Sequence, residues 1–225
     1  KSVGNIGQGT WYLGENLRYE KKEIDTLKTG IQHGMNLIDT AEMYGDGGAE
    51  IVTGKAISGL IREDLYIVSK VYPWNGDRKN IFNSCENSLK RLNIDYLDLY
   101  LLHWKGSTPL SETVGCMEEL KESGLIRQWG VSNFDIDDME ELFKVPKGDR
   151  CSVNQVLYHL GSRGVEYSLL PWMQEHNVLM MAYCPLAQDG SLKRDLLENE
   201  TLNEIARDHN ATPHQILLSF LCSKP

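Results

Sequence analysis

Four polar residues in the first half of the chain have side chains that can act together in proton transfer: Asp39, Tyr44, Lys70 and His103. A tyrosine hydroxyl has an ordinary pKa of about 10, too high for easy proton exchange at neutral pH, but a nearby ammonium stabilises the phenolate and lowers that pKa. Lys70 would supply the ammonium, and an ion pair with Asp39 would keep it charged and oriented. His103 would donate a hydrogen bond to a substrate oxygen beside the Tyr44 hydroxyl.

This combination of a proton donor and an oxygen-binding pocket suits the reduction of a carbonyl group. Tyr44 would protonate the developing alkoxide as a general acid. Because no side chain donates hydride, a nicotinamide cofactor is required. Each residue alone also has an ordinary structural explanation, since an aspartate can cap a turn, a tyrosine can pack at a rim and a histidine can be hydrogen-bonded in a core. Their shared position at the ends of apolar runs favours the chemical interpretation.

Apolar runs alternate with segments of helical periodicity along the whole chain. The expected strands cover residues 3–11, 37–39, 65–70, 97–103, 126–131, 152–157 and 178–183. The expected helices cover residues 20–33, 49–60, 81–92, 110–123, 137–143, 169–176, 196–210 and 212–222, the last beginning with a capping box at Thr212-Pro213-His214-Gln215. The runs are rich in leucine and β-branched residues without strict alternation, as in a parallel sheet covered by helices. Their ends carry Asp39, Lys70, His103, Ser132-Asn133, Asn154-Gln155 and Tyr183.

The repeated strand and helix pattern predicts a (β/α)8 TIM barrel, with residues 1–225 forming a single domain. Seven expected strands fall one short of closing such a barrel, so we expect the eighth to lie beyond Pro225. An open doubly wound sheet is the alternative. It is disfavoured because no G-x-G-x-x-G motif follows the first strand. In a barrel of this kind the active site lies where the strands end.

Composition narrows the classes of partner. The net charge is −9 and the basic residues are scattered, which argues against nucleic-acid binding. No apolar run is long enough to cross a membrane, and no signal peptide is present, so we expect a cytoplasmic protein. The histidines and cysteines lack ligand-like spacing, so no metal site is expected. A monomer is expected because no heptad run is present. The cysteines, predicted to be reduced core thiols, are Cys85, Cys116, Cys151, Cys184 and Cys222.

Motifs at the strand ends give the whole chain a specific family resemblance. They are Gly9-Thr10-Trp11, Asp39-Thr40-Ala41 with Tyr44-Gly45, Ser69-Lys70, Asp98-Leu99-Tyr100-Leu101-Leu102-His103-Trp104, Gly130-Val131-Ser132-Asn133-Phe134 and Asn154-Gln155. In this order they resemble the motifs of the aldo-keto reductases. The stretch 181–186 is similar to prokaryotic members that reduce small aldehydes and ketones.

The resemblance implies a role for each matching residue. Asp39, Tyr44, Lys70 and His103 would form the catalytic tetrad, with Tyr44 as the proton donor. The residues implied to bind NADPH are Gly9, Thr10, Trp11, Asp39, Ser132, Asn133, Gln155, Tyr183, Cys184, Pro185, Leu186 and Gln188. Among these, Ser132, Asn133 and Gln155 would bind the nicotinamide carboxamide. Tyr183 would stack on the nicotinamide ring, and residues 184–188 would follow the pyrophosphate.

Two family features have no counterpart in the sequence. Members begin with a β-hairpin that closes the barrel floor, and their eighth strand and the segment after it hold the 2′-phosphate of NADP. The expected fold therefore lacks the N-terminal hairpin, the eighth strand and the C-terminal helix and loop. The preference for NADPH follows family habit, and NADH is an alternative. A second interpretation is a cofactor-binding regulatory barrel of the channel β-subunit type. A cofactor-free lyase or hydrolase is disfavoured because paired carboxylates and metal ligands are missing from the strand ends.

Aromatic residues follow several of the strands that carry the tetrad. We expect them to line an apolar pocket for a small carbonyl substrate above Tyr44 and His103. The pocket residues are Trp11, Tyr72, Trp74 and Trp104. Ordinary packing at the barrel rim is the alternative explanation.

Overall fold

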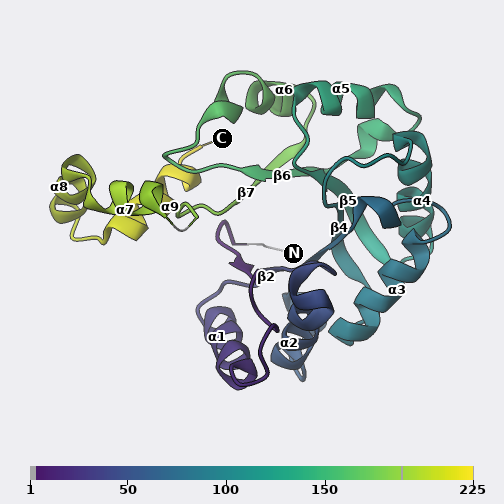
Figure 1. Cartoon of the computed structure of the whole chain (residues 1–225), viewed down its shortest axis with the longest axis horizontal. Helices are drawn as coiled ribbons and strands as arrows, with labels where there is room; N and C mark the ends of the chain where they lie inside the picture. Colours follow the sequence, from purple (N-terminus) through teal and green to yellow (C-terminus); the bar gives the residue numbers. More distant parts are fainter. Residues whose placement is uncertain (1–3, 189, 225) are drawn as a thin grey trace. The chain divides into compact units, whose positions relative to one another are not determined.

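The computed structural model describes residues 4–188 and 190–224, which alternate between strands and helices (Figure 1). Their strands form a seven-stranded sheet whose order, β1 to β7, is the order of the chain. The strands are β1 (Gln8–Gly9), β2 (Leu37–Asp39), β3 (Tyr66–Val71), β4 (Leu97–Leu102), β5 (Ile126–Ser132), β6 (Val153–Leu157) and β7 (Leu179–Tyr183). β1 to β5 pair in parallel, and every residue of β4 is buried, as expected for a strand covered on both faces.

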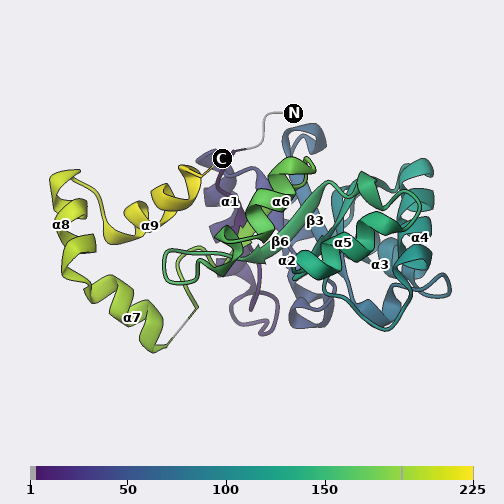
Figure 2. The same ribbon diagram turned by 90° about the horizontal axis from the view of Figure 1, so that it is seen from above.

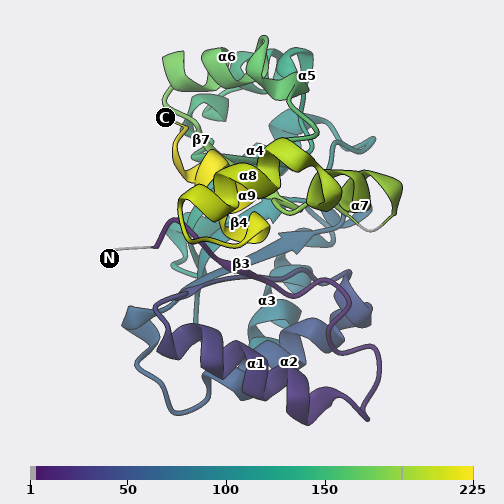
Figure 3. The same cartoon turned by 90° about the vertical axis from the view of Figure 1, so that its left-hand side faces the viewer.

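The chain divides into two compact units, residues 1–154 and 155–225. The prediction that residues 1–225 form a single domain stays a prediction. The helices of the first unit are α1 (Glu20–Gln32), α2 (Gly48–Ile57), α3 (Ile81–Leu92), α4 (Leu110–Glu122) and α5 (Ile136–Lys144). α1 and α2 lie side by side (Figure 3). Leu27 of α1 forms a buried cluster with Val52 and Ala56 of α2. α3 and α4 pack on β3 and β5, so the outward faces of these strands are covered by helices.

Helices also occur in the second unit, where Figure 2 labels them. They are α6 (Leu169–Glu175), α7 (Ser191–Glu198), α8 (Glu200–Asp208) and α9 (Pro213–Cys222). The prediction of one helix over 196–210 is wrong, because Asn199 has an extended ψ of 122° and its side chain accepts a hydrogen bond from the Leu202 amide at 3.0 Å. Asn199 thus ends one helix and caps the next. The predicted capping box is confirmed: Thr212 and Gln215 exchange side-chain to backbone hydrogen bonds at the start of α9.

Short 3-10 helices occupy several connections between these elements. They are η1 (Tyr44–Gly47), η2 (Arg62–Asp64), η3 (Pro73–Asn75), η4 (Gly148–Arg150) and η5 (Gly164–Glu166). η1 and η3 follow β2 and β3 and therefore lie at the strand ends where the sequence places the site. The first strand is shorter than the expected extended stretch 3–11, of which residue 3 lies outside the described residues.

The strand ends agree with the sequence for most of the predicted polar residues. Asp39 ends β2, Ser132 ends β5 and Tyr183 ends β7. β3 continues one residue past Lys70, and His103 directly follows β4. The placement of Asn154-Gln155 at the end of β6 is wrong. β6 runs from Val153 to Leu157, so Asn154 and Gln155 lie within the strand and not at its end. Hydrogen bonding to β5 is already present at Ser152, whose amide donates to the Trp129 carbonyl at 3.0 Å.

The cysteines are all free thiols, as predicted, but they are not all core residues. Cys85, Cys116 and Cys151 are buried, whereas Cys184 is half-buried and Cys222 is exposed. Burial raises the pKa of Cys85 to about 12 and that of Cys151 to about 12, which makes both poor nucleophiles. None of the helices within residues 4–188 and 190–224 combines the length and apolar character needed to cross a bilayer.

Candidate active site

A tight turn after β2 positions the first two site residues. β2 ends at Asp39, and Tyr44 opens the 3-10 turn η1. Three consecutive residues of this turn have left-handed backbones, with φ of 57° at Gly45, 52° at Asp46 and 84° at Gly47. A side chain at Gly45 would lie 2.9 Å from the Leu13 carbonyl, so glycine is needed there both for its φ and for space.

Lys70 joins the acid to the tyrosine. Its Nζ lies 2.8 Å from each carboxylate oxygen of Asp39 and 3.2 Å from the Tyr44 hydroxyl oxygen. A fourth acceptor is the Thr40 carbonyl oxygen, at 3.0 Å. The Lys70 side chain is 0% exposed and that of Asp39 is 13% exposed. All N–H groups of the ammonium therefore have acceptors within the site, and solvent has little access to the ion pair.

Burial alone would lower the pKa of Lys70, but the negative charges of Asp39 and of an ionised Tyr44 outweigh it and raise the pKa above its usual value. Lys70 is therefore an ammonium at neutral pH. It lies 4.8 Å from the centre of the Tyr44 ring, so the cation also faces the aromatic ring itself. The predicted electrostatic role of Lys70 beside Tyr44 has the geometry that it needs.

His103 lies beside Tyr44, with their ring centres 5.8 Å apart and the rings nearly perpendicular. It is 7% exposed, and its Nδ1 has no hydrogen-bond partner among the described residues. Burial, and then the positive charge of Lys70, lower the pKa of His103 to about 3. The backbone of His103 is held by Val71, which accepts from its amide at 3.0 Å, and by the Asn133 side chain, which donates to its carbonyl at 3.1 Å.

We expect His103 to stay neutral over the working pH range of the protein. Its ring signals in a ¹H–¹³C NMR spectrum should not titrate between about pH 5 and 8, whereas an ordinary histidine has its midpoint near 6.5. His103→Asn identifies the signal by its loss. Because the folded pKa lies below the unfolded one, the contribution of His103 to stability is complete above about pH 6.5 and is lost as the pH falls toward 3. A midpoint between pH 6 and 7 would contradict this placement.

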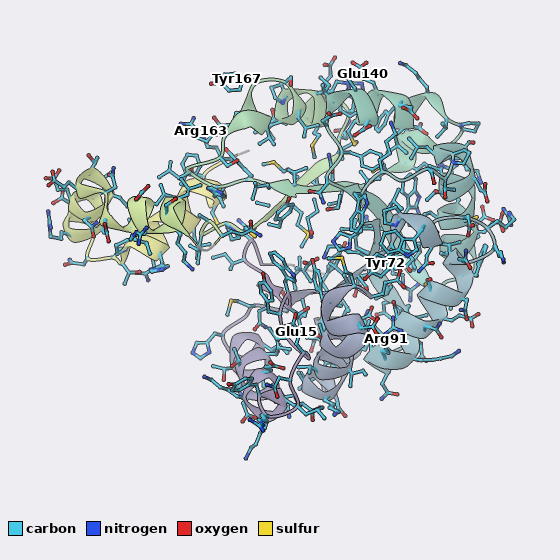
Figure 4. All side chains as sticks on the ribbon, viewed as in Figure 1. Glu15, Tyr72, Arg91, Glu140, Arg163 and Tyr167 are labelled. Carbon is cyan, nitrogen blue, oxygen red and sulfur yellow. The ribbon has the colours of Figure 1, made fainter. Side chains whose placement is uncertain are left out.

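Aromatic rings gather around the ends of β3 and β4. Tyr72 and Trp74 stack with ring centres 4.2 Å apart, and Trp104 meets them edge-on at 6.2 Å and 5.8 Å. Trp104 also contacts His103, at 4.9 Å between ring centres. The structure thus brings three of the four predicted pocket residues together next to the tetrad, and Figure 4 labels Tyr72 among them. Trp11 stacks instead on its neighbour Tyr12 at 4.5 Å and is 40% exposed.

The predicted cofactor residues are distributed over both units. In the first unit Gly9 pairs with Asp39 in the sheet, and the Thr10 hydroxyl donates to the Asp39 carbonyl at 3.1 Å. Ser132 is buried, and the adjacent Asn133, with φ of 59°, donates to its hydroxyl at 3.2 Å. These residues surround the tetrad strands.

In the second unit the Gln155 side chain lies 3.1 Å from the Met181 sulfur, and Tyr183 is half-buried. The loop that follows β7 contains Cys184, Pro185, Leu186 and Gln188. It folds back through a bond from the Ala187 amide to the Cys184 carbonyl at 2.9 Å. The cofactor roles of all these residues, in both units, stay predictions.

Two acidic residues beside the tetrad were missed by sequence reasoning. Glu42 accepts hydrogen bonds from the Tyr72 amide at 2.7 Å and from the Asn75 side chain at 3.1 Å. These bonds link the segment after β3, which carries Tyr72, to the segment that leads into Tyr44. Glu50, in the first turn of α2, is completely buried. The available signal was a glutamate within an otherwise apolar helix face, since an acid is rarely buried without partners.

The parallel strands, the alternating helices and a buried lysine that joins a carboxylate to a tyrosine hydroxyl define a barrel enzyme equipped for proton transfer at the strand ends. The model of the Aldo/keto reductase family matches residues 5–225, and the chain belongs to this family. It is therefore an oxidoreductase that reduces carbonyl groups. The predicted (β/α)8 class and the predicted enzyme are both confirmed, and the channel-subunit interpretation is not favoured.

Similar proteins include several bacterial reductases. Methylglyoxal reductase YeaE of Escherichia coli (strain K12) is 56% identical over 222 residues, which cover 99% of this chain and 78% of that protein. Glyoxal reductase of Bacillus subtilis (strain 168) is 38% identical over 199 residues, covering 87% and 68%. Among solved structures, an aldo/keto reductase from Klebsiella pneumoniae in complex with NADP and acetate has a TM-score of 0.96 at 52% identity, covering 99% of this chain and 78% of that one.

Proposed function

We propose that this chain reduces small α-oxoaldehydes, with methylglyoxal as the leading candidate, using NADPH. The observation that carries the proposal is Lys70, fully buried and bonded at once to the Asp39 carboxylate and the Tyr44 hydroxyl. Similarity to methylglyoxal reductase YeaE and to glyoxal reductase supports the substrate class. Similarity to structures that contain NADP or NADPH supports the cofactor, although one relative is an NADH-specific methylglyoxal reductase.

The proposed donor set suits the cofactor chemically. A nicotinamide carboxamide has one acceptor and one donor group, and the side chains of Ser132 and Asn133 in the first unit offer both kinds of partner. Tyr183 offers a half-buried aromatic ring for stacking. The loop after β7, residues 184–188, is the segment that the family resemblance places along the pyrophosphate of the cofactor. When bound, NADPH supplies the hydride.

The residues of the tetrad would transfer a proton to the carbonyl oxygen of the substrate. As negative charge develops on the carbonyl oxygen, Tyr44 donates its phenolic proton to that oxygen, and the Lys70 ammonium at 3.2 Å stabilises the phenolate that remains. Asp39 holds Lys70 charged and in place. His103, neutral because its pKa is about 3, would position the same oxygen by a hydrogen bond without competing as an acid.

The aromatic group of Tyr72, Trp74 and Trp104 would form the wall of the substrate pocket. Large flat rings suit a small planar dicarbonyl better than a flexible sugar, because they offer contact area and few hydrogen-bond partners. That Trp74 is 60% exposed fits a wall at the mouth of the site.

The proposal is tested by following the absorbance of reduced nicotinamide in mixtures of the full chain, NADPH and a series of aldehydes. We expect kcat/KM to be higher for methylglyoxal and glyoxal than for glucose, and higher with NADPH than with NADH by about tenfold or more, equivalent to about 1.4 kcal/mol. Equal values for the two cofactors would contradict the cofactor preference. Turnover of none of the aldehydes would contradict the proposed reaction.

A further inference from the structure

Glu50, a buried acidic residue outside the tetrad, lies on the helix that follows the Tyr44 turn and bonds to the strand that carries Lys70. Glu50 is 0% exposed, and each of its carboxylate oxygens has one close donor. Ser69 donates its hydroxyl proton to Oε1 at 2.5 Å, and Arg91 donates from Nε to Oε2 at 2.6 Å. Charged hydrogen bonds of this length in a buried place are strong and directional. The three groups come from β3, α2 and α3.

The Ser69 bond ties Glu50 to the strand of the catalytic lysine. Ser69 and Lys70 are consecutive residues of β3, so their side chains point to opposite faces of the strand. Lys70 reaches Asp39 and Tyr44 on one face, and Ser69 reaches α2 on the other. A displacement of α2 along β3 would therefore break the bond to Ser69.

Arg91, which donates to Glu50, also lies against the turn that carries Tyr44. Arg91 of α3, labelled in Figure 4, reaches Glu50 of α2 through its Nε, and its side chain lies against Gly47 of η1. A Cβ atom on Gly47 would lie 2.7 Å from Cδ and from Nε of Arg91. Gly47 is the last of the three left-handed residues after Tyr44, and α2 begins at the next residue. Since glycine-rich backbone resists deformation weakly, this turn needs outside support to hold Tyr44 in one place.

We propose that Glu50, with Arg91 and Ser69, positions Tyr44 against Lys70 for proton donation. Because Glu50 is fully buried, we assign it no contact with substrate or cofactor. It is a positioning residue that fixes the far end of the turn to β3, while Asp39 and the pairing of β2 with β3 fix the near end. The inference rests on the proposed role of Tyr44 as proton donor. Small displacements of a catalytic group lower the rate strongly, because a misplacement of about 1 Å can lower a rate about 100-fold.

The chain offers a matched control in the same unit. Glu118 of α4 is 2% exposed and has the same kind of partners, with the Trp129 indole N–H at 2.6 Å and Arg150 at 2.5 Å. It is a buried glutamate bonded to one neutral donor of a strand and to one arginine. None of these bonds involves a residue of the tetrad or of its turn. Loss of Glu118 therefore reports what the loss of a buried ion pair does by itself.

The test compares Glu50→Gln with Glu118→Gln in the full chain, with methylglyoxal and NADPH. For Glu50→Gln we expect kcat per NADPH-binding site, counted by fluorescence titration, to fall about 10- to 100-fold. KM for methylglyoxal and the Kd for NADPH should change by less than about threefold, since ground-state binding is untouched. Glu118→Gln should keep kcat per site within about twofold. Counting sites separates misplacement of Tyr44 from a simple loss of folded protein.

A second variant covers the case in which Glu50→Gln does not fold. Ser69→Ala removes only the hydrogen bond from the serine hydroxyl to Glu50, and we expect kcat per site to fall about 2- to 10-fold with KM unchanged. The proposal is overturned if the folded variants keep the wild-type kcat per site, or if Glu118→Gln loses as much activity as Glu50→Gln. Tyr44→Phe separates a failure of the positioning role of Glu50 from a failure of Tyr44 as the proton donor. If that variant keeps full activity, Tyr44 is not the proton donor and the positioning role fails with it; if it is inactive while Glu50→Gln is normal, only the positioning role fails.

Discussion

Tyr44→Phe is expected to lower kcat for aldehyde reduction about 100- to 10,000-fold, the usual contribution of a general acid. The substitution removes the only atom that Tyr44 offers to the substrate oxygen and keeps the ring that faces Lys70 at 4.8 Å. Cofactor binding should be unchanged, because the predicted contacts to NADPH do not use the hydroxyl. The measurement is steady-state oxidation of NADPH with methylglyoxal, together with fluorescence titration of NADPH.

Tyr66→Phe is a matched control for the loss of a tyrosine hydroxyl. Tyr66 begins β3, the strand that carries Lys70, and its hydroxyl donates to the Gln128 side chain at 2.9 Å. It lies at the opposite end of the strand from the tetrad. We expect this variant to keep the wild-type kcat. If Tyr44→Phe turned over aldehyde at the wild-type rate, Tyr44 would not be the proton donor.

The fold was predictable where apolar runs mark the strands and where neighbouring strands in the sheet are also consecutive in the chain. The strands of β2 to β5 were placed to within about two residues, because each is a short apolar run bounded by polar residues. Since strand order in the sheet follows the chain, residues at successive strand ends had to become neighbours. The break at Asn199 was missed because helical periodicity continues across it, and only the local cap decides that two helices form.

The site was predictable for residues whose role depends on their own type and strand position. Asp39, Lys70 and His103 are of this kind, and the structure brings them to Tyr44 as expected. Glu50 and Arg91 are different. They are 41 residues apart in the chain, and their pairing depends on how α2 and α3 face each other. Helix periodicity gives the buried face of each helix but not the rotation that matches one side chain to another. The support of the Tyr44 turn was therefore visible only in three dimensions.

Lys70→Met is the second large effect that we expect. With the ammonium gone, no charge stabilises the phenolate of Tyr44, and kcat should fall about as far as in Tyr44→Phe. The variant also leaves the Asp39 carboxylate, which is 13% exposed, without its buried partner. Removal of one member of a buried ion pair typically costs about 3 to 5 kcal/mol of unfolding free energy, which urea denaturation measures.

The double variant Asp39→Asn with Lys70→Met separates the chemical role of the pair from its role in stability. Neutralising both partners removes the unpaired buried charge, so we expect most of the lost unfolding free energy to return, because buried ion pairs contribute little net stability. Activity should stay as low as in Lys70→Met, because the charge beside the Tyr44 hydroxyl at 3.2 Å is still missing. Recovery of activity along with stability would mean that Lys70 serves the fold and that the proton donor works without it.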